Sequence, residues 1–427
     1  MFINLNKIFK NFLVFILIVS CFIFGNSYAD DIETNYDKSD PLSFDTAKDF
    51  NNLLQTSSLT ESLNINARSC IVLDRNSNTV LYGKNENSKV KMASTTKIMT
   101  ATVIIENCNL KETVEVSKKA AGTGGSRLGL KAGDKITIHD LLYGLMLCSG
   151  NDAAVALAET CSGSIQNFSD LMNNKAKDLG LKDTHFESPH GLDSDNHYTT
   201  AYELALLSNY ALQNPTFRTI VGTKNYTVTI NGYPKTLSNT NELLGNLNGV
   251  YGIKTGFTNG ANRCLVTACK RDNIDIICVV LGCDTKKFRT QDSIKLIEYT
   301  YKNFELVDIS DIINNEFNLW KNEKIDNFNI IKGNSNNFDI YLSNLENSAI
   351  PIKKDTIKEL KVDIDCSYIF KSPIYKNTPI GSLTLSTKDK IIANLNILTT
   401  NTIEKKSVHD YLKQLIYSIT PSIESIL

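Results

Sequence analysis

The sequence has almost no excess of charge of either sign. Its 45 lysines and arginines stand against 46 aspartates and glutamates, which gives a formal net charge of −1 at pH 7. A nucleic-acid-binding protein would ordinarily show a basic face, so the composition gives no indication of such a partner. With 427 residues, 42% of them hydrophobic, the chain is long enough for one large domain and a smaller one, each with its own core.

The cysteines and histidines lack the spacing of a metal site. Cys264 and Cys269 are five residues apart, as are Cys278 and Cys283, and neither pair fits a zinc motif. No carboxylate or cysteine completes a ligand set around the histidines at 190 and 197, which we interpret as structural. We therefore expect no metal and no cofactor.

An apolar run over residues 12–25 is shorter than the roughly 20 residues that span a bilayer comfortably. Lys7 and Lys10 precede this run, and Ser27-Tyr28-Ala29 follows it with small residues at the −3 and −1 positions of a cleavage site. This order predicts a signal peptide over residues 1–29 and an exported protein. An uncleaved N-terminal anchor is the alternative.

The signal peptide would remove Cys21 and leave nine of the ten cysteines. Nine is odd, so at least one cysteine is unpaired or pairs between chains. Most of them lie in apolar runs such as residues 276–280, so we expect buried thiols that pack as small hydrophobic side chains.

Strand patterns lie at both ends of the segment 61–305 and helix patterns lie between them. Hairpin signals occur over residues 70–82 and 264–282, and a further strand is expected over 226–230, before Asn231-Gly232. Helices are expected over residues 95–108, 138–147, 151–161, 200–212 and 293–301. The pattern predicts an α+β domain in which an antiparallel sheet carries a helical cluster.

Three further segments complete the predicted organisation. Residues 30–60 are polar and read as a flexible lead-in, and residues 315–400 carry short alternating segments typical of a small all-β domain. In the tail, 404–427, residues 407–419 form a helical pattern with one apolar stripe. This helix could lie on a membrane surface or pack on the protein, and the sequence leaves both open.

Ser94 and Lys97 form the first candidate catalytic pair. Residues i and i+3 share a helix face, so the lysine amine can reach the serine hydroxyl at the start of the predicted helix. A serine needs a base to take its proton, and a lysine can serve when its surroundings favour the neutral amine. The pair alone is weak support, because Ser88 and Lys91 have the same spacing.

Two further motifs follow in a fixed order. Ser149-Gly150-Asn151 separates two predicted helices, and Lys254-Thr255-Gly256 occurs once, in a strand pattern. Glycine after Lys-Thr allows a strand edge to approach a substrate backbone closely. The order Ser-x-x-Lys, Ser-x-Asn, Lys-Thr-Gly is the set found in penicillin-binding proteins and class A β-lactamases.

From about residue 41 to the tail, the sequence resembles the D-alanyl-D-alanine carboxypeptidases, the low-molecular-weight penicillin-binding proteins. The resemblance implies a penicillin-binding, β-lactamase-like catalytic domain, then a β-rich domain and an amphipathic membrane-binding helix. It is carried by residues 92–101 (MASTTKIMTA), 140–147 (DLLYGLML), 149–154 (SGNDAA), 189–192 (PHGL), 197–201 (HYTTA) and 252–258 (GIKTGFT).

The resemblance also implies a role for each site residue. Ser94 would attack the carbonyl between the two terminal D-alanines of a peptidoglycan stem peptide, with Lys97 as its base. Ser149 and Lys254 would relay the proton to the leaving D-alanine, and Asn151 would orient the substrate amide and Lys97. Water would then release the acyl-enzyme, and a β-lactam would leave Ser94 slowly.

The terminal carboxylate and the oxyanion have their own expected partners. Thr255, in the Lys-Thr-Gly strand, would bind the carboxylate with support from Arg289, whose planar fork suits a carboxylate. The backbone N–H groups of Ser94 and Phe257 would form the oxyanion hole, close to Gly256. Two departures from the family pattern are Asn262, where glycine is usual, and Cys148, which directly precedes the Ser-x-Asn motif.

Three alternatives remain open on the sequence. A class A β-lactamase would need a Glu-x-x-Leu-Asn segment, and the nearest match, beginning at Glu242, lacks the leucine and lies just before Lys254. A non-catalytic penicillin-binding sensor or wall-binding module is the second alternative, and the intact Ser94, Lys97 and Lys254 argue against it. An endopeptidase that cuts peptide cross-links has no distinguishing motif. We expect an enzyme at the extracytoplasmic face of the membrane or in the cell wall.

Overall fold

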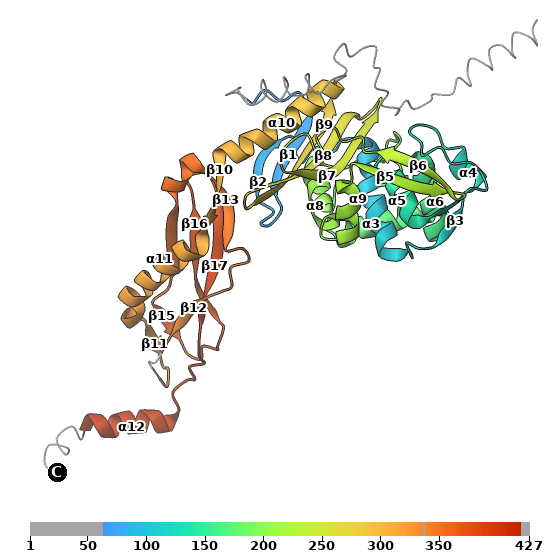
Figure 1. Cartoon of the computed structure of the whole chain (residues 1–427). Coiled ribbons are helices and arrows are strands. Elements are labelled where there is room, and N and C mark those ends of the chain that lie inside the picture. The colour runs from blue at the N-terminus through green and yellow to red at the C-terminus, as the bar shows by residue number, and fades with distance from the viewer. Residues whose placement is uncertain (1–62, 336–337, 420–427) are drawn as a thin grey trace, which may run out of the picture. The chain divides into compact units, whose positions relative to one another are not determined.

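The computed structural model describes residues 63–335 and 338–419, so the predicted signal peptide and the predicted lead-in, residues 1–60, lie outside the described residues. These residues form two compact units that divide between Tyr299 and Thr300 (Figure 1). Each unit has its own hydrophobic core. The units are therefore treated separately.

The first unit contains a five-stranded antiparallel sheet with the order β2-β1-β9-β8-β7. All ten residues of β9 are buried, which accounts for the unbroken apolar run in its sequence. The strand β7 lies at one edge of the sheet, and this edge carries the Lys-Thr-Gly motif. The bounds are β1 Ser69–Asp74, β2 Val80–Lys84, β7 Val250–Thr258, β8 Asn262–Arg271 and β9 Ile274–Cys283.

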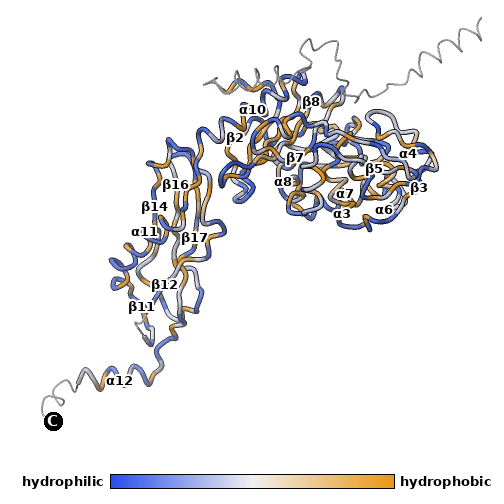
Figure 2. The backbone as a smooth tube through the Cα atoms, viewed as in Figure 1, coloured by the Kyte–Doolittle hydropathy of each residue, from blue (hydrophilic) through white to orange (hydrophobic). Residues whose placement is uncertain are grey.

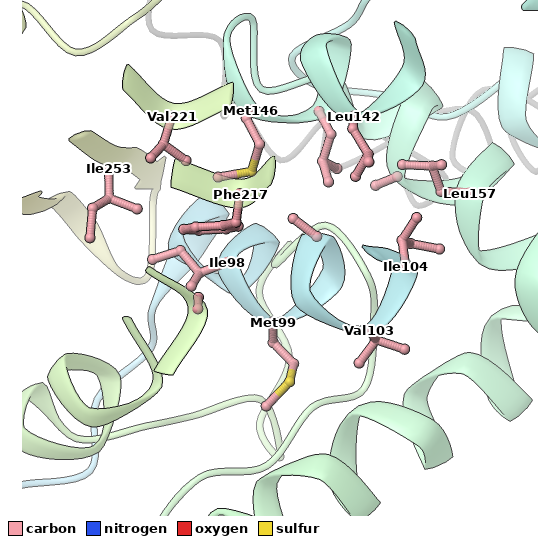
Figure 3. Close-up of a cluster of buried hydrophobic side chains, with 14 of the residues drawn as sticks. Ile98, Met99, Val103, Ile104, Leu142, Met146, Leu157, Phe217, Val221 and Ile253 are labelled. Atoms are coloured by element: carbon pink, nitrogen blue, oxygen red, sulfur yellow. The ribbon is translucent and has the colours of Figure 1, made fainter. Parts of the chain in front are cut away.

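A helical cluster packs around α3, and Figure 3 shows its buried side chains. Ile98, Met99 and Ile104 of α3 are fully buried, and Phe217 and Leu142 from two other helices belong to the same core. The helices are η1 Ala93–Thr96, α3 Lys97–Asn107, α4 Lys118–Ala121, α5 Ile138–Met146, α6 Asn151–Ser162, α7 Ile165–Asp178, α8 Ala201–Ala211 and α9 Pro215–Gly222.

Two small hairpins complete the cluster, β3 Thr113–Glu115 with β4 Lys135–Thr137, and β5 Asn225–Ile230 with β6 Tyr233–Ser238. The predicted α+β architecture is confirmed.

The last helix of this region, α10 Lys286–Asn303, begins well before the predicted residue 293, so Arg289 lies on a helix and not in a loop.

The second unit is β-rich, and its main sheet has the order β12-β17-β16-β14. The strands β10 and β13 pair antiparallel, and β11 and β15 pair parallel. The bounds are β10 Phe304–Asp308, β11 Asn329–Ile331, β12 Ile340–Leu342, β13 Ala349–Lys353, β14 Lys361–Cys366, β15 Ile369–Lys371, β16 Pro379–Ser386 and β17 Ile391–Thr399, with short 3-10 turns η2 Ile325–Asn327 and η3 Lys354–Glu359.

The second unit also contains a helix that we did not predict, α11 Ile309–Lys324. Its buried residues, Ile309, Ile313 and Phe317, recur every four positions and therefore share one face, which packs in this unit's core. The surrounding sequence is rich in asparagine, which masks this stripe.

The tail forms the helix α12 Val408–Ile419, as predicted. Hydrophobic and hydrophilic residues alternate along it (Figure 2). Its apolar side chains are exposed, among them Val408, Leu412, Leu415 and Ile416. Within the described residues, no helix is both long and apolar enough to cross a membrane.

Candidate active site

Lys97 is the centre of the hydrogen-bonding network in the candidate site. Its side chain is fully buried, and Nζ donates to Ser94 Oγ at 2.7 Å and to Asn151 Oδ1 at 2.7 Å. A third bond runs from Nζ to the backbone carbonyl of His190 at 2.9 Å. The structure thus brings together the Ser-x-x-Lys motif and the asparagine of the Ser-x-Asn motif.

Ser94 lies in η1, one residue after Ala93 and directly before the turn that leads into α3. Its side chain is almost fully buried, with 5% of the residue exposed. The backbone N–H groups at the start of a helix are free of intrahelical partners and favour negative charge. The position of Ser94 therefore suits a hydroxyl that becomes an anion during attack.

Asn151 begins α6, and both ends of its amide are occupied. Its Oδ1 accepts from Lys97, and its Nδ2 donates to the carbonyl of Gly124 at 2.9 Å. Two residues earlier, Ser149 has a φ of +59°, which is uncommon outside glycine and asparagine. Such backbone conformations gather at functional sites, where the surrounding structure holds them in place.

The strand β7 passes very close to the nucleophile. A Cβ atom added to Gly256 would lie 3.1 Å from the backbone nitrogen of Ser94 and 3.2 Å from Cβ of Ala93. This clearance explains the glycine of the Lys-Thr-Gly motif. Phe257, the second expected donor of the oxyanion hole, is the next residue on this strand.

Lys254 is the second buried amine of the site region. Only 1% of the residue is exposed, and Nζ donates to the carbonyl of Thr255 at 3.0 Å. The Thr255 hydroxyl lies 2.7 Å from that of Thr240. Lys254, Thr255 and Gly256 therefore lie on the sheet edge that faces η1.

Arg289, the predicted site residue on α10, forms a buried ion pair. Its side chain is fully buried, and Nη2 pairs with Oε1 of Glu242 at 2.5 Å. Although burial raises the pKa of Glu242, the charges of Arg289 and Lys286 bring it below its ordinary value. The Glu242 carboxylate is thus an ion-pair partner and not a free base.

The two departures from the family pattern have local explanations. Asn262 has a φ of +57°, a conformation that glycine adopts freely and asparagine tolerates. The Cys148 thiol donates to the carbonyl of Gly144 at 3.1 Å, and burial raises its pKa to about 11. The thiol therefore stays protonated and unreactive near neutral pH.

His197 contacts η1, the segment that carries Ser94, through Thr96. Its Nδ1 accepts the backbone N–H of Glu187 at 3.0 Å, so Nε2 carries the proton and donates to Thr96 Oγ1 at 2.7 Å. Thr96 Oγ1 in turn donates to the carbonyl of Ala93 at 2.8 Å. Among the residues that the structure describes, no cluster of histidine, cysteine and carboxylate side chains could hold a metal ion.

Sequence reasoning missed the groups that act through their backbone or behind the site. The carbonyls of His190 and Gly124 leave no side-chain signal in a sequence. Asp152 accepts the N–H groups of Leu128, Gly129 and Leu130 at 2.7–2.9 Å and is fully buried. In the sequence, the position of Asp152 directly after Asn151 could have marked it as a residue that supports the site.

A serine that contacts a buried lysine beside a Ser-x-Asn loop and a Lys-Thr-Gly strand defines the acyl-serine enzymes of the penicillin-binding class. Residues 55–285 match the model of the D-alanyl-D-alanine carboxypeptidase family, and residues 319–405 match that of the penicillin-binding protein 5 C-terminal domain. The chain belongs to the D-alanyl-D-alanine carboxypeptidase family.

Known relatives cover most of the chain. It is 32% identical to the D-alanyl-D-alanine carboxypeptidase DacF of Bacillus subtilis over 362 residues, which are 83% of this chain and 90% of that protein. It is 31% identical to DacD of Escherichia coli, over 83% of this chain and 91% of the relative.

Solved structures agree with these matches. The D-alanyl-D-alanine carboxypeptidase DacD from Francisella tularensis superposes with a TM-score of 0.66 at 26% identity, covering 80% of this chain and 95% of that one. Penicillin-binding protein 5 from Haemophilus influenzae gives a TM-score of 0.65 at 27% identity, covering 81% and 100%. The predicted fold class is confirmed in both of its parts.

Proposed function

We propose that this carboxypeptidase removes the terminal D-alanine from peptidoglycan stem peptides through an acyl-enzyme on Ser94. The observation that carries the proposal is the set of three hydrogen bonds made by the buried Lys97 amine. As a neutral amine, Lys97 would keep its two N–H donors for Asn151 and the His190 carbonyl and turn its lone pair to the Ser94 hydroxyl, which lies 2.7 Å away and within reach for proton transfer. Asn151 and the His190 carbonyl hold it there.

The proposed reaction has two halves. Lys97 takes the proton of Ser94 as its oxygen attacks the penultimate D-alanine carbonyl, and the N–H groups of Ser94 and Phe257 receive the oxyanion. Ser149 and Lys254 deliver a proton to the departing D-alanine amine. Water then attacks the ester and frees Ser94, whereas a β-lactam keeps its leaving group tethered and remains bound.

Recognition of the substrate's free C-terminus is assigned to β7. The Thr255 hydroxyl would bind the carboxylate, and Arg289 would add its positive charge from its buried ion pair with Glu242. An uncharged C-terminus would lose this interaction, so we expect preference for a free carboxylate.

A β-lactamase is disfavoured by Glu242. A deacylating glutamate must be free to activate water, whereas the Glu242 carboxylate is engaged by Arg289 and Thr290. A non-catalytic sensor is disfavoured because Ser94, Lys97 and Asn151 form one buried hydrogen-bonding network. Cutting of peptide cross-links would use the same groups and stays an accompanying activity to be measured.

The deciding experiment is release of D-alanine from diacetyl-Lys-D-Ala-D-Ala, compared between Ser94→Ala and Ser88→Ala. The control serine has a lysine three residues later, but it is exposed and outside the network. We expect Ser94→Ala to abolish release and Ser88→Ala to keep the wild-type rate. Release that persists without Ser94, or a wild type that binds penicillin but releases no D-alanine, would contradict the proposal.

We also propose that the enzyme works outside the cytoplasm, with α12 lying on the membrane surface. The signal-peptide pattern of residues 1–29 and the location of peptidoglycan support the first part. The exposed apolar residues Val408, Leu412, Leu415 and Ile416 support the second, because such a stripe on a helix is typical of interfacial helices.

A further inference from the structure

Glu242 is a charged residue near the site that the proposed reaction does not use. Its Oε1 accepts from Arg289 Nη2 at 2.5 Å and from the Thr290 hydroxyl, both on α10. Its second oxygen, Oε2, is buried and has no hydrogen-bond partner. A carboxylate in this position holds a buried guanidinium in one orientation and cancels its charge.

The residues just before Glu242 contact the substrate-binding strand. Thr240 Oγ1 lies 2.7 Å from Thr255 Oγ1, and Asn241 Nδ2 donates to the carbonyl of Gly252 at 3.0 Å. The segment 240–242 therefore joins β7 to α10. It contacts both residues assigned to the terminal carboxylate, Thr255 and Arg289.

We propose that Glu242 is a positioning residue that sets how strongly the site prefers a free terminal carboxylate. This inference rests on the proposed function of Thr255 and Arg289. By pairing with Arg289, Glu242 offsets a positive charge that would otherwise act on the substrate carboxylate. The electrostatic attraction between Arg289 and the substrate carboxylate is consequently weaker than it would be without Glu242. Glu242 also keeps Arg289 oriented when no substrate is present.

Glu242→Gln tests this inference, because glutamine keeps the acceptor oxygen and removes the charge. The probes are benzylpenicillin, which carries a carboxylate, and its methyl ester, which does not. The second-order rate constant for acylation of Ser94 is followed by mass spectrometry of the intact protein. The acid-to-ester ratio is the rate constant for benzylpenicillin divided by that for its methyl ester. We expect this ratio to rise on the order of tenfold in Glu242→Gln. This is the effect of one unit charge about 10 Å away at an effective dielectric constant of about 20.

With the D-Ala-D-Ala peptide, the same variant should lower KM and leave kcat nearly unchanged, because the carboxylate is bound equally before and during the reaction. The matched control is Glu298→Gln. Glu298 lies on α10, and its carboxylate pairs with Arg271. Its acid-to-ester ratio should equal that of the wild type. Equal changes for acid and ester in Glu242→Gln would overturn the proposal.

A double variant keeps the test decisive if Glu242→Gln unfolds. Glu242→Gln with Arg289→Gln replaces the ion pair by two amides, leaves no unpaired buried charge and keeps the wild-type net charge. Arg289→Gln alone leaves the Glu242 charge unopposed, so adding Glu242→Gln should raise the acid-to-ester ratio on the order of tenfold above that of Arg289→Gln. Equal ratios in these two variants would show that the Glu242 charge does not act on the bound carboxylate. Penicillin acylation does not need D-alanine release, so failure of the peptidase assay alone would count against the proposed function only.

Discussion

At the scale of single residues, the site depends on where one amine is held. Lys97 Nζ has three acceptors, and they come from η1, α6 and the loop that carries His190. Full burial makes each bond matter, because a buried amine that lost an acceptor could not replace it with bulk water. The nucleophile is thus placed by three segments that are far apart in the sequence.

His197 gives this region a predictable response to acid. Burial lowers its pKa to about 4, against about 6.5 in an unfolded chain. Below pH 6.5 the unfolded state binds a proton that the folded state does not. The free energy of unfolding should therefore fall between pH 6.5 and 4, by up to about 1.4 kcal/mol per pH unit.

Urea unfolding at pH 7 and pH 5 measures this effect, and His197→Gln should remove it. His409→Gln, which changes an exposed histidine on α12, is the control and should unfold like the wild type at both values. The same pH sensitivity in His197→Gln as in the wild type would contradict the assignment. His190, whose pKa is lowered to about 3 by burial and by Lys97, adds a contribution of the same sign that both variants keep.

At this scale, the sequence allowed the side chains of the site to be predicted but not their supports. The spacing of Ser94 and Lys97 follows from helix geometry, and their contact was predictable. The carbonyl of His190 is a backbone group that every residue has, so no residue type could mark it. The pairing of Glu242 with Arg289 depends on a contact across 47 residues.

At the scale of elements, the close approach of β7 to η1 shapes the candidate site. Gly256 makes it possible, because any side chain at this position would press on Ser94 and Ala93. An edge strand that carries the site can also offer its unpaired backbone groups to an extended peptide. The proposed carboxylate-binding residue Thr255 and the proposed oxyanion-hole donor Phe257 thus lie on one strand.

Gly256→Ala should therefore impair the reaction more than the fold. We expect the rate of Ser94 acylation by benzylpenicillin to fall by about tenfold to 100-fold, since small displacements of reacting groups are costly. Thermal unfolding and acylation should be measured together. The comparison variant is Gly252→Ala, on the same strand, where an added Cβ would lie 3.0 Å from the Val221 side chain in the core.

Gly252→Ala should lower stability at least as much as Gly256→Ala but reduce acylation less. Equal acylation losses in the two variants would argue that strand packing in general, and not the approach to Ser94, is responsible.

Several elements were predictable because their apolar runs are long and uninterrupted by Gly or Pro, as in α3, or bounded by turn residues, as in β9. Two misses have physical causes. The helix α11 was assigned to a β-rich region because its apolar residues, Ile309, Ile313 and Phe317, are separated by asparagine and acidic residues. The start of α10 carries Lys286 and Lys287, which hid the helical continuation as far as Arg289.

At the scale of the whole molecule, the proposed active site and the proposed membrane-binding helix belong to different parts of the chain. Every proposed site residue belongs to the first compact unit, and α12 belongs to the second. A change in the tail should therefore affect location without affecting turnover.

The pair of substitutions Leu412→Asp and Leu415→Asp tests the membrane role of α12. We expect the wild type to sediment with vesicles of phosphatidylglycerol and phosphatidylcholine and the double variant to lose at least tenfold in affinity, because two exposed apolar anchors are removed. Gln414→Asp, on the same helix, should stay within about twofold of the wild type. D-alanine release should be equal in all three, and vesicle binding by the double variant equal to the wild type would contradict a membrane role.

The central claim is that Ser94 is the residue acylated. Mass spectrometry of the protein after exposure to benzylpenicillin, with proteolysis and mapping of the adduct, tests it most directly. The account predicts one penicilloyl group on the peptide that contains Ser94, and none in Ser94→Ala. An adduct on any other peptide, or undiminished labelling of Ser94→Ala, would contradict it.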